Sequence, residues 1–293
     1  MSPIDTQVIG ICRWSYPAGV GDFRLTPENL NAAHETLYDD SRMKHRLFLL
    51  RNVVLPALRA QTDPDFTVVF LMGDHLPEPY RTRVLALLAQ VPQIRPVFMS
   101  EGQSQKDVVR RLMLETRNPD ASTVAEFRLD DDDAIAVDFV AETRATFREI
   151  LPLYNRTGLF GVDYTRGIVM MTTRNSCEVK PITARWWAPG MVVFIRPDIP
   201  RSILDFHHMR LWHEMHTLMH ADKPMFVRGI HHNNDSSIEK FGKRSGRYPF
   251  DRSRTQSFMQ ERFGIDFRKV KRHWKQNADM FLGQPAAISL AAE

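Results

Sequence analysis

The sequence predicts an α/β protein with a mostly parallel central sheet and helices on both faces. Strand-like and helix-like segments alternate through the first two-thirds of the chain, which is typical of such sheets. The strand-like segments are nearly continuous apolar runs, such as FTVVFLM at residues 66–72, as expected for strands buried on both sides. The 293 residues are 43% hydrophobic and 25% charged, which is enough for a sizeable core.

The first half of the chain carries the clearest element patterns. Short apolar runs predict strands at residues 7–12, 66–72, 94–99 and 124–129. Apolar residues at helical spacing predict helices at residues 46–60, 79–91, 105–116 and 137–151. Pro56 lies inside the first of these helices and should kink or interrupt it, because proline has no backbone N–H to donate.

The second half is less regular, and its predicted elements are shorter. Residues 158–162 and 167–172 are predicted to form a hairpin, and residues 191–195 to form another strand, whereas residues 225–230 lead into His231 with no element assigned. Residues 201–221 are predicted to be helical and contain five histidines, His207, His208, His213, His216 and His220. A last helix is predicted in the second half of residues 258–281.

Four consecutive aspartates, Asp130 to Asp133, follow the predicted strand at residues 124–129. Adjacent carboxylates repel one another, so a folded protein keeps them together only where water or a cation relieves the repulsion. Carboxylate oxygens suit Mg²⁺ or Mn²⁺, and Mg²⁺ often takes one or two carboxylates plus substrate phosphates. The run therefore predicts either a divalent metal site that holds a diphosphate or a solvated acidic loop at a helix start.

Two segments are expected to meet at one edge of the sheet. Ligands of open parallel sheets bind beyond the carboxyl ends of the strands. Arg13, Trp14 and Ser15 follow the first predicted strand, and the aspartates follow another. Their shared edge is the predicted position of a binding cleft.

Two further groups of residues admit two interpretations each. His213, His216 and His220 have i, i+3, i+7 spacing and would share one helix face, which could be a zinc site or a polar surface. Trp186 and Trp187 could stack on an acceptor sugar or pack in the core.

The ordered set of motifs resembles the GT-A class of nucleotide-sugar-dependent glycosyltransferases, and more narrowly the bacterial family described as putative rhamnosyltransferases. The matching segments are Arg13-Trp14-Ser15, Leu55-Pro56, Gln61-Thr62-Asp63 with Asp65-Phe66, Arg128-Leu129-Asp130-Asp131-Asp132-Asp133, and Gly229-Ile230-His231-His232-Asn233-Asn234. One departure is His232, where family members favour glycine. The resemblance implies a GT-A-like catalytic domain over residues 1–239 and a basic, mainly helical extension over residues 240–293.

The resemblance also implies the residues of a metal and donor site. Asp130 would contact the ribose or the donor sugar, and Asp132 would bind the divalent ion that bridges the two phosphates. Asp131 and Asp133 would belong to the same donor site. His231 would complete the metal coordination by Asp132 and Asp130.

The nucleotide pocket is implied in the same way. Arg13, Trp14 and Ser15 would line it, and Arg110 or Arg111 would add a polar contact to the nucleotide.

The chemistry of glycosyl transfer also needs a proton acceptor. Loss of the nucleoside diphosphate builds up negative charge that a metal ion stabilises, while one general base deprotonates the acceptor hydroxyl. In inverting enzymes of this class the base is usually an acid well downstream of the metal motif, so Glu214 is the first candidate and Asp205 the second. His208 is an acceptor contact or an alternative base, and Glu214 could instead be a surface acid.

Charge is unevenly distributed along the chain. The net charge is +4, but residues 240–275 contain twelve Lys or Arg and only three acids. This basic end suits anionic partners such as a nucleotide diphosphate or the anionic inner face of the cell membrane, or it is simply a solvated surface. A cytoplasmic protein is expected, because no secretory signal pattern or membrane-length apolar run is present. Cys12 and Cys177 are then expected to be reduced, with Cys177 inert.

The leading hypothesis is a Mn²⁺- or Mg²⁺-dependent, inverting glycosyltransferase. It would move a sugar such as rhamnose or another hexose from a nucleotide-diphosphate donor to a saccharide or lipid-linked acceptor of the cell envelope. One alternative is a nucleic-acid-binding protein that uses the basic C-terminal region, although the rest of the chain is acidic and no nucleic-acid-binding fold is recognised, so no nucleic acid is expected. The other is a Mg²⁺-dependent nucleotidyltransferase or hydrolase that uses the same aspartates.

Overall fold

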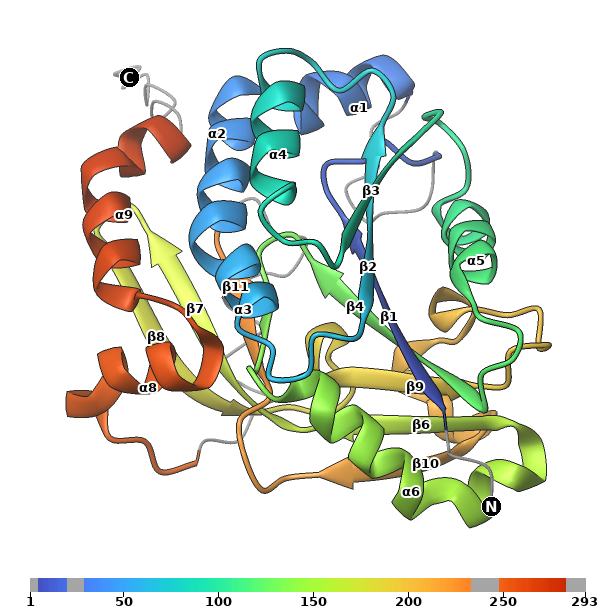
Figure 1. Ribbon diagram of the computed structural model, residues 1–293. Helices are drawn as coiled ribbons and strands as arrows, with labels where there is room; N and C mark the ends of the chain where they lie inside the picture. The colour runs from blue at the N-terminus through green and yellow to red at the C-terminus, as the bar shows by residue number, and fades with distance from the viewer. Residues whose placement is uncertain (1–4, 20–28, 233–247, 283–293) are drawn as a thin grey trace, which may run out of the picture.

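A central seven-stranded sheet organises the protein, which we describe from a computed structural model (Figure 1). The structure describes residues 5–19, 29–232 and 248–282. The strand order is β10-β6-β9-β4-β1-β2-β3. The strands are β1 (Thr6–Arg13), β2 (Thr67–Gly73), β3 (Ile94–Met99), β4 (Thr123–Asp130), β6 (Leu159–Tyr164), β9 (Met191–Ile195) and β10 (His216–His220).

The central sheet is mostly parallel, as predicted. β3, β2, β1 and β4 run parallel to one another, and only β9 runs antiparallel, between β4 and β6. The carboxyl ends of β1, β2, β3 and β4 therefore lie at one edge of the sheet. The α/β class and the predicted strands of the first half are confirmed.

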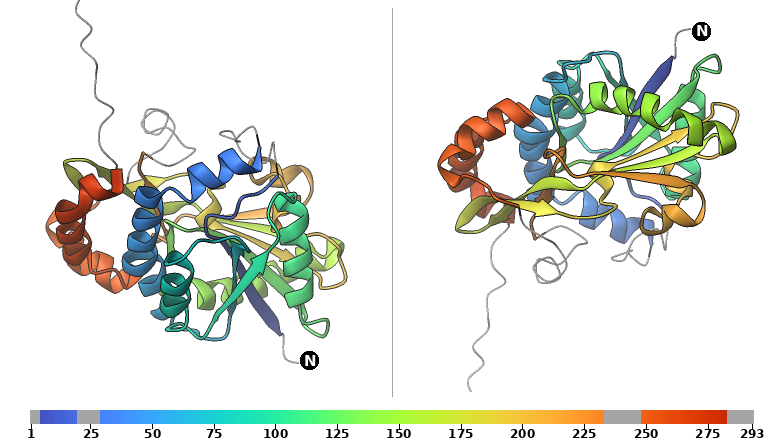
Figure 2. Two further views of the ribbon diagram at one scale, coloured as in Figure 1. Left: turned by 90° about the horizontal axis from the view of Figure 1, so that it is seen from above. Right: turned by 90° about the horizontal axis from the view of Figure 1, so that it is seen from below.

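Helices cover both faces of this sheet. On one face lie α2 (Asp40–Leu49), α3 (Leu55–Arg59), α4 (Tyr80–Leu88) and α6 (Phe139–Thr157). On the other lies α5 (Gln105–Thr116), and Figure 2 shows it across the sheet from α4. A short helix that was not predicted, α1 (Leu30–Leu37), precedes α2.

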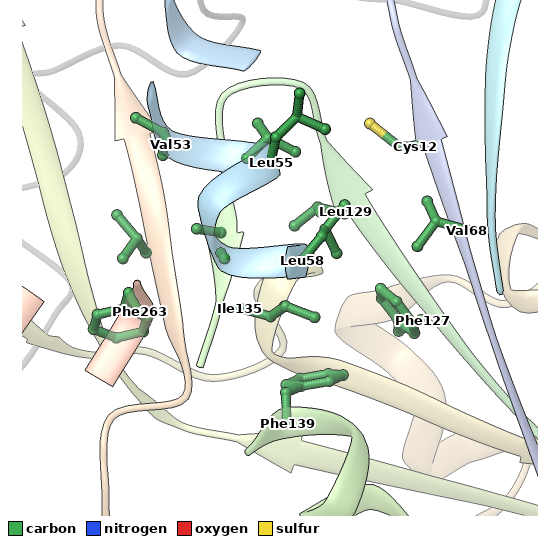
Figure 3. Packing of buried hydrophobic residues seen from close by; sticks show 14 of the residues in the cluster. Cys12, Val53, Leu55, Leu58, Val68, Phe127, Leu129, Ile135, Phe139 and Phe263 are labelled. Atoms are coloured by element: carbon green, nitrogen blue, oxygen red, sulfur yellow. The ribbon is translucent and has the colours of Figure 1, made fainter. Parts of the chain in front are cut away.

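The main core is the apolar cluster on the α2–α4 and α6 face (Figure 3). Leu55 and Leu58 of α3 lie there beside Phe127 and Leu129 of β4. Gly10 of β1 makes room for this layer, because a Cβ atom there would lie 2.4 Å from the Phe127 ring. A second core lies under α5 and includes Ile9, Ile11, Val69, Val109 and Met191.

The predicted interruption at Pro56 is confirmed. A π-helix, Leu50–Val54, joins α2 to α3, and Pro56 is in the first turn of α3. The Asn52 side chain donates a hydrogen bond to the Phe48 carbonyl, 2.8 Å away, within this segment. Pro56 is well placed at a helix start, where a backbone N–H is not needed.

The predicted hairpin of residues 158–162 and 167–172 is wrong. β6 belongs to the central sheet, whereas β7 (Arg166–Thr173) belongs to a second, four-stranded sheet of order β5-β11-β7-β8. The other strands of that sheet are β5 (Ala134–Ile135), β8 (Ser176–Thr183) and β11 (Phe226–Ile230). The true hairpin is β7–β8, and β8 escapes prediction because Glu178, Lys180 and Pro181 suit only an edge strand.

The predicted helix at residues 201–221 is also wrong. The segment forms two 3₁₀ turns, Ile203–Asp205 and His208–His213, and then enters the sheet as β10 beside β6. A capping box between Ser202 and Asp205 closes the first turn, and Arg210 has a non-helical φ of −136°. Histidine spacing that looked helical is therefore spread over a turn and a strand.

The C-terminal helices α8 (Thr255–Phe263) and α9 (Phe267–Leu282) pack onto the main core. α9 buries a face of Phe267, Val270, Trp274, Ala278 and Phe281 against α2 and β8. Its other face exposes Arg268, Lys271, Arg272 and Lys275. The predicted boundary between residues 239 and 240 lies outside the described residues and stays a prediction.

Within the described part of the chain, no helix is both long and apolar enough to cross a membrane.

Candidate active site

The two predicted edge segments meet in the structure. β1 and β4 are parallel neighbours, and their register pairs Arg13 with Asp130, the last residue of each strand. The aspartate run and the segment Arg13-Trp14-Ser15 therefore start side by side, at the carboxyl ends of β4 and β1. The parallel-sheet rule predicted this edge correctly.

The cation that relieves part of the aspartate repulsion is Arg46 of α2. Its Nη1 lies 2.6 Å from Asp131 Oδ1 and 3.4 Å from Asp132 Oδ2. The Arg46 side chain is only 6% exposed, so this is a buried ion pair. No sequence pattern points to Arg46, because it stands 85 residues before Asp131.

A second arginine, Arg228 of β11, reaches the other two carboxylates. Its Nη1 lies 3.3 Å from Asp133 Oδ2 and 3.7 Å from Asp130 Oδ2. The Gly229 N–H donates a 2.9 Å hydrogen bond to Asp133 Oδ1. A Cβ atom on Gly229 would lie 2.6 Å from the Asp132 carbonyl oxygen, so only glycine lets β11 approach the aspartate loop this closely.

The four carboxyl groups divide into two pairs by environment. Burial raises the pKa of Asp131, and it raises the pKa of Asp133 well above the usual range, despite the arginine beside each. For Asp130, burial is outweighed by Arg128 and Arg228, and the pKa is lowered. For Asp132, Arg46 and the hydrogen bond from His231 outweigh burial and lower the pKa well below its usual range. Asp130 and Asp132, the two residues of the predicted Asp-x-Asp pair, are therefore the two whose pKa is lowered.

His231 lies directly against the aspartates. Its Nε2 is 2.9 Å from Asp132 Oδ2, and the residue is 2% exposed. Burial and the charge of Arg46 lower the pKa of His231 to about 4. A neutral imidazole beside an ionised carboxylate has the protonation states that metal ligands need. Asn233 and Asn234 of the same motif lie outside the described residues.

The residues predicted to line the nucleotide pocket separate. Arg13 Nη1 donates a 2.7 Å hydrogen bond to Gln105 Oε1, at the start of α5. Ser15 has a φ of 49°, and its hydroxyl accepts a 2.8 Å hydrogen bond from Arg42. Trp14 is fully buried in the main core, so its side chain does not line this edge.

Arg110 and Arg111 lie further along α5. Arg110 forms a two-point ion pair with Asp205, with Nε 2.8 Å from Oδ2. Arg111 is exposed, and its Nη2 lies 3.8 Å from Met99 Sδ. Arg110 was predicted to contact the nucleotide and Asp205 to be a candidate base, and the two side chains contact each other.

The three candidate bases differ sharply in their surroundings. Asp205 is held by Arg110 and by the Ser202 N–H at 2.8 Å, and burial is outweighed so that its pKa is lowered. Glu214 is 37% exposed and forms a 2.5 Å ion pair with Arg201. The pKa of His208 is lowered to about 4, first by loss of water around the ring and then by Arg128, His207 and Arg228, with Asp130 opposing them. Apart from the neighbouring His207, the charges that act on His208 are those of the aspartate site.

Asp163 is a titratable residue that the sequence did not single out. It is fully buried near the end of β6, where Oδ2 accepts a 2.7 Å hydrogen bond from the Trp186 N–H and Oδ1 has no partner among the described residues. Burial raises the pKa of Asp163 to about 7. Trp186 itself packs in the second core, which favours core packing over stacking on an acceptor sugar.

Trp187 and Cys177 both lie in apolar surroundings. Trp187 lies at the edge of the Phe226 cluster, with the Arg228 guanidinium 5.6 Å from its ring. Cys177 is buried, and burial raises the pKa of its thiol to about 12, which favours the predicted inert thiol.

The motif at residues 61–66 holds the segment that follows the aspartates by hydrogen bonds and ion pairs. The Gln61 side chain donates to the Ala136 carbonyl at 2.8 Å and accepts from the Val140 N–H at 3.2 Å. Asp63 and Asp65 both bind Arg144 of α6. These residues fix the chain where it leaves the aspartates and enters α6.

Comparison with known proteins identifies the relatives of this chain. A family described as "Putative rhamnosyl transferase" matches residues 7–243. No curated protein matches the sequence.

Solved structures give more distant likenesses. TarS residues 1–349 of S. aureus in complex with UDP-GlcNAc is 8% identical, with a TM-score of 0.42, over 78% of this chain and 60% of that one. A Bacillus anthracis protein described as a "Putative Glucose-1-Phosphate Thymidylyltransferase" is 10% identical, with a TM-score of 0.38, over 75% of this chain and 88% of that one. Mouse xyloside xylosyltransferase 1 is 10% identical, with a TM-score of 0.28, over 56% and 54%. This chain thus spans three-fifths of the TarS fragment.

Proposed function

The chain belongs to the family described as "Putative rhamnosyl transferase", and from this premise we propose that it transfers a sugar from a nucleotide-diphosphate donor to an acceptor hydroxyl. The donor sugar is rhamnose or another hexose, and the acceptor is a saccharide or lipid-linked saccharide of the cell envelope. The observation that carries the proposal is the meeting of Asp130, Asp132 and His231 at the carboxyl edge of β1 and β4. Sheet edges of this kind are where nucleotides bind in open α/β folds.

The donor set fits a divalent ion. Asp132 is ionised and its Oδ2 is 2.9 Å from the neutral His231 Nε2, so two ligands of the implied set already lie together. Asp132 and His231, with Asp130, would hold Mn²⁺ or Mg²⁺, which would supply Lewis-acid stabilisation of the leaving diphosphate. Arg128 and Arg228 are 30% and 18% exposed beside Asp130, and their guanidinium groups would bind phosphate oxygens.

His208 takes the role of general base in this proposal, with inversion at the sugar carbon. Its neutral ring at pH 7 can accept a proton, and Asp130 is among the charges that act on it. Glu214 and Asp205 are each committed to an arginine. We expect His208→Gln to lower the transfer rate by about 10²-fold or more at unchanged donor affinity, and Glu214→Gln to lower it less. The opposite order would return the role of base to Glu214.

The exposed basic face of α9 suits docking of the protein on an anionic membrane. Arg268, Lys271, Arg272 and Lys275 would dock the protein on the anionic inner face of the cell membrane, near a lipid-linked acceptor. Sedimentation with anionic vesicles at low salt tests this. Failure of the wild type to bind them would remove the membrane contact from the proposal.

The experiment for the function itself is a thermal-shift panel. UDP, GDP, dTDP, CDP and ADP are each tested with and without Mn²⁺ on wild type, on Asp132→Asn and on the control Asp222→Asn, an exposed aspartate. A ligand at 100 times its Kd stabilises the folded state by about 2.7 kcal/mol. We expect one nucleotide to give a Mn²⁺-dependent shift that Asp132→Asn loses and Asp222→Asn keeps. No shift with any nucleotide would contradict the proposal.

Product analysis then separates transfer from the two related reactions. With the nucleotide sugar and an acceptor, transfer releases a nucleoside diphosphate and extends the acceptor. Release of pyrophosphate from a nucleoside triphosphate and a sugar phosphate would indicate a nucleotidyltransferase. Free sugar released at the same rate with and without acceptor would indicate a hydrolase.

A further inference from the structure

Three histidines from distant parts of the chain converge beside Asp132. His45 lies on α2, and His231 and His232 directly follow β11. The His45 ring centroid is 4.6 Å from that of His231 and 5.6 Å from that of His232. One ring nitrogen of each lies within 4.8 Å of the others. We name His45, His231 and His232 the converging histidines.

His45 is the independent indication that this cluster holds a ligand. It is 0% exposed, and neither of its ring nitrogens has a hydrogen-bond partner among the described residues. Its other neighbours are the aromatic rings of Phe48, Trp274 and Phe281, which offer no partner. A buried polar group without a partner is costly, so a ligand on this imidazole would relieve a real penalty.

We propose that His45, His231 and His232 bind a transition-metal ion such as Zn²⁺ or Co²⁺ in preference to Mg²⁺, with Asp132 held beside the ion by its hydrogen bond to His231. Imidazole nitrogen suits these ions, whereas Mg²⁺ and Ca²⁺ prefer oxygen. Three imidazoles are the protein ligands of one class of zinc site, in which water or a substrate takes the fourth position. The inference rests on the proposed function only for the ion's role beside the donor diphosphate, and metal binding itself can be measured without a substrate.

The ligand atoms must move closer together to hold an ion. With metal–ligand bonds of about 2.1 Å, two ligand atoms of a tetrahedral ion stand about 3.4 Å apart. The ligand atoms here lie within 4.8 Å, and His232 is exposed and can move inward.

Arg46 is the group that opposes a cation here. It lies 3.4 Å from Asp132 Oδ2, but its closer partner, at 2.6 Å, is Asp131. Asp132 Oδ2 has its closer contact with His231, at 2.9 Å. Asp132 Oδ2 would therefore stay paired with His231 and Arg46, and the three imidazoles would hold the ion.

A Co²⁺ titration of the full chain, freed of metal by chelation, tests the proposal. Tetrahedral Co²⁺ absorbs visible light far more strongly, and at longer wavelength, than octahedral Co²⁺ held by water or carboxylate oxygens. We expect one equivalent of Co²⁺ to give this spectrum and to raise the melting temperature, Zn²⁺ to abolish the spectrum, and a large excess of Mg²⁺ to leave it unchanged.

Two variants probe the ligands separately. His45→Phe keeps an aromatic ring in an aromatic pocket, and His232→Ala removes an exposed side chain that the core does not need. We expect each to weaken Co²⁺ binding by about 10-fold or more, by analogy with losses seen around metal sites. His213→Ala, an exposed histidine elsewhere, is the matched control and should bind as wild type does. Equal affinity in His232→Ala and wild type, or displacement of Co²⁺ by Mg²⁺, would overturn the proposal.

Failure here is distinguishable from failure of the proposed function. If the histidine variants keep the metal affinity and the nucleotide shift, whereas Asp132→Asn loses the nucleotide shift, the histidine site is overturned and the function stands. If Co²⁺ binds through the histidines but no nucleotide binds, the metal site stands and the function fails.

Discussion

The converging histidines and the downstream histidines (His207, His208, His213, His216 and His220) differ in how sequence distance relates to distance in space. The downstream group lies within 14 residues, yet it is divided between a 3₁₀ turn and β10. His216 and His220 stand at opposite ends of that strand, about 13 Å apart by the rise of a strand. The converging group is gathered from α2 and from the end of β11, and two of its rings are 4.6 Å apart.

The difference shows what decides where chemistry collects in this fold. A run of like residues in one segment shares a face only if the segment is regular, and residues 201–221 are not. Convergence at the sheet edge depends instead on topology, which brings α2, β4 and β11 together. Six substitutions test this contrast.

The largest effect is expected from Arg46→Met. It leaves the buried carboxylates of Asp131 and Asp132 without their guanidinium partner, and breaking such a pair costs about 3–5 kcal/mol. The equivalent change among the downstream residues, Arg210→Met, alters an exposed side chain and should stay within about 0.5 kcal/mol. Urea unfolding at pH 7 compares the two. Equal losses would mean that the aspartates are neutralised by something else.

Asp163→Asn is expected to stabilise the protein at high pH. Asp163 is beside β10, and its pKa of about 7 in the folded state exceeds the usual value for an unfolded chain. Between about pH 4 and pH 7 the folded state holds a proton that the unfolded state has lost, so stability falls as pH rises. Above pH 7, the ionised and buried Asp163 lowers the free energy of unfolding by about 2–4 kcal/mol, and asparagine avoids this loss.

The measurement is urea unfolding of wild type and Asp163→Asn at pH 5 and pH 8. The variant should gain at pH 8 relative to pH 5. A constant difference between the two proteins at both pH values would show that Asp163 is ionised when folded.

Gly229→Ala and Gly161→Ala compare backbone packing in the two regions. A Cβ on Gly229 meets the Asp132 backbone at 2.6 Å, which cannot give way cheaply, so the loss should be about 1–3 kcal/mol. A Cβ on Gly161 meets the Thr217 methyl group at 3.2 Å and Leu211 at 3.4 Å, which can adjust. We expect Gly161→Ala to cost less than Gly229→Ala in thermal unfolding. The reverse order would show that the aspartate loop is not tightly packed against β11.

The smallest effect is expected from Glu214→Gln. It breaks an ion pair with Arg201 in which both side chains are 37% exposed, and such pairs contribute about 0–1 kcal/mol. The difference in the free energy of unfolding should shrink further in high salt. A loss above about 2 kcal/mol would show that Glu214 supports the fold of the downstream segment.

The sequence predicted those parts of the molecule that follow from local pattern and one topological rule. Apolar runs located β1 to β4, and parallel strand order placed Asp130 beside Arg13. The partners of the aspartates escaped prediction, because Arg46 and Arg228 lie on helices and strands far away in sequence. His45 escaped for the same reason, since a single histidine in an amphipathic helix carries no pattern of its own.

Family resemblance supplied what pattern could not, but only at the level of motifs. It drew attention to His231, which contacts Asp132, and to Gln61, whose role proves to be support of the loop. It also suggested Trp14 for the nucleotide pocket, although that ring is in the main core. A motif marks a segment as important without saying which side chain faces the ligand.

The π-helix between α2 and α3 determines how the side chains of α2 are rotated about the helix axis relative to those of α3. A π turn contains an extra residue, so the face that carries Arg42, His45 and Arg46 is keyed independently of the face by which Leu55 and Leu58 enter the core. Removing a single residue such as Asn52 would turn the upper face by about 100° relative to the lower one. Arg46 would then point away from the aspartates while Leu55 and Leu58 stayed in the core. The orientation of Arg46 therefore depends on the extra residue of the π-helix, and core packing of α3 alone does not determine it.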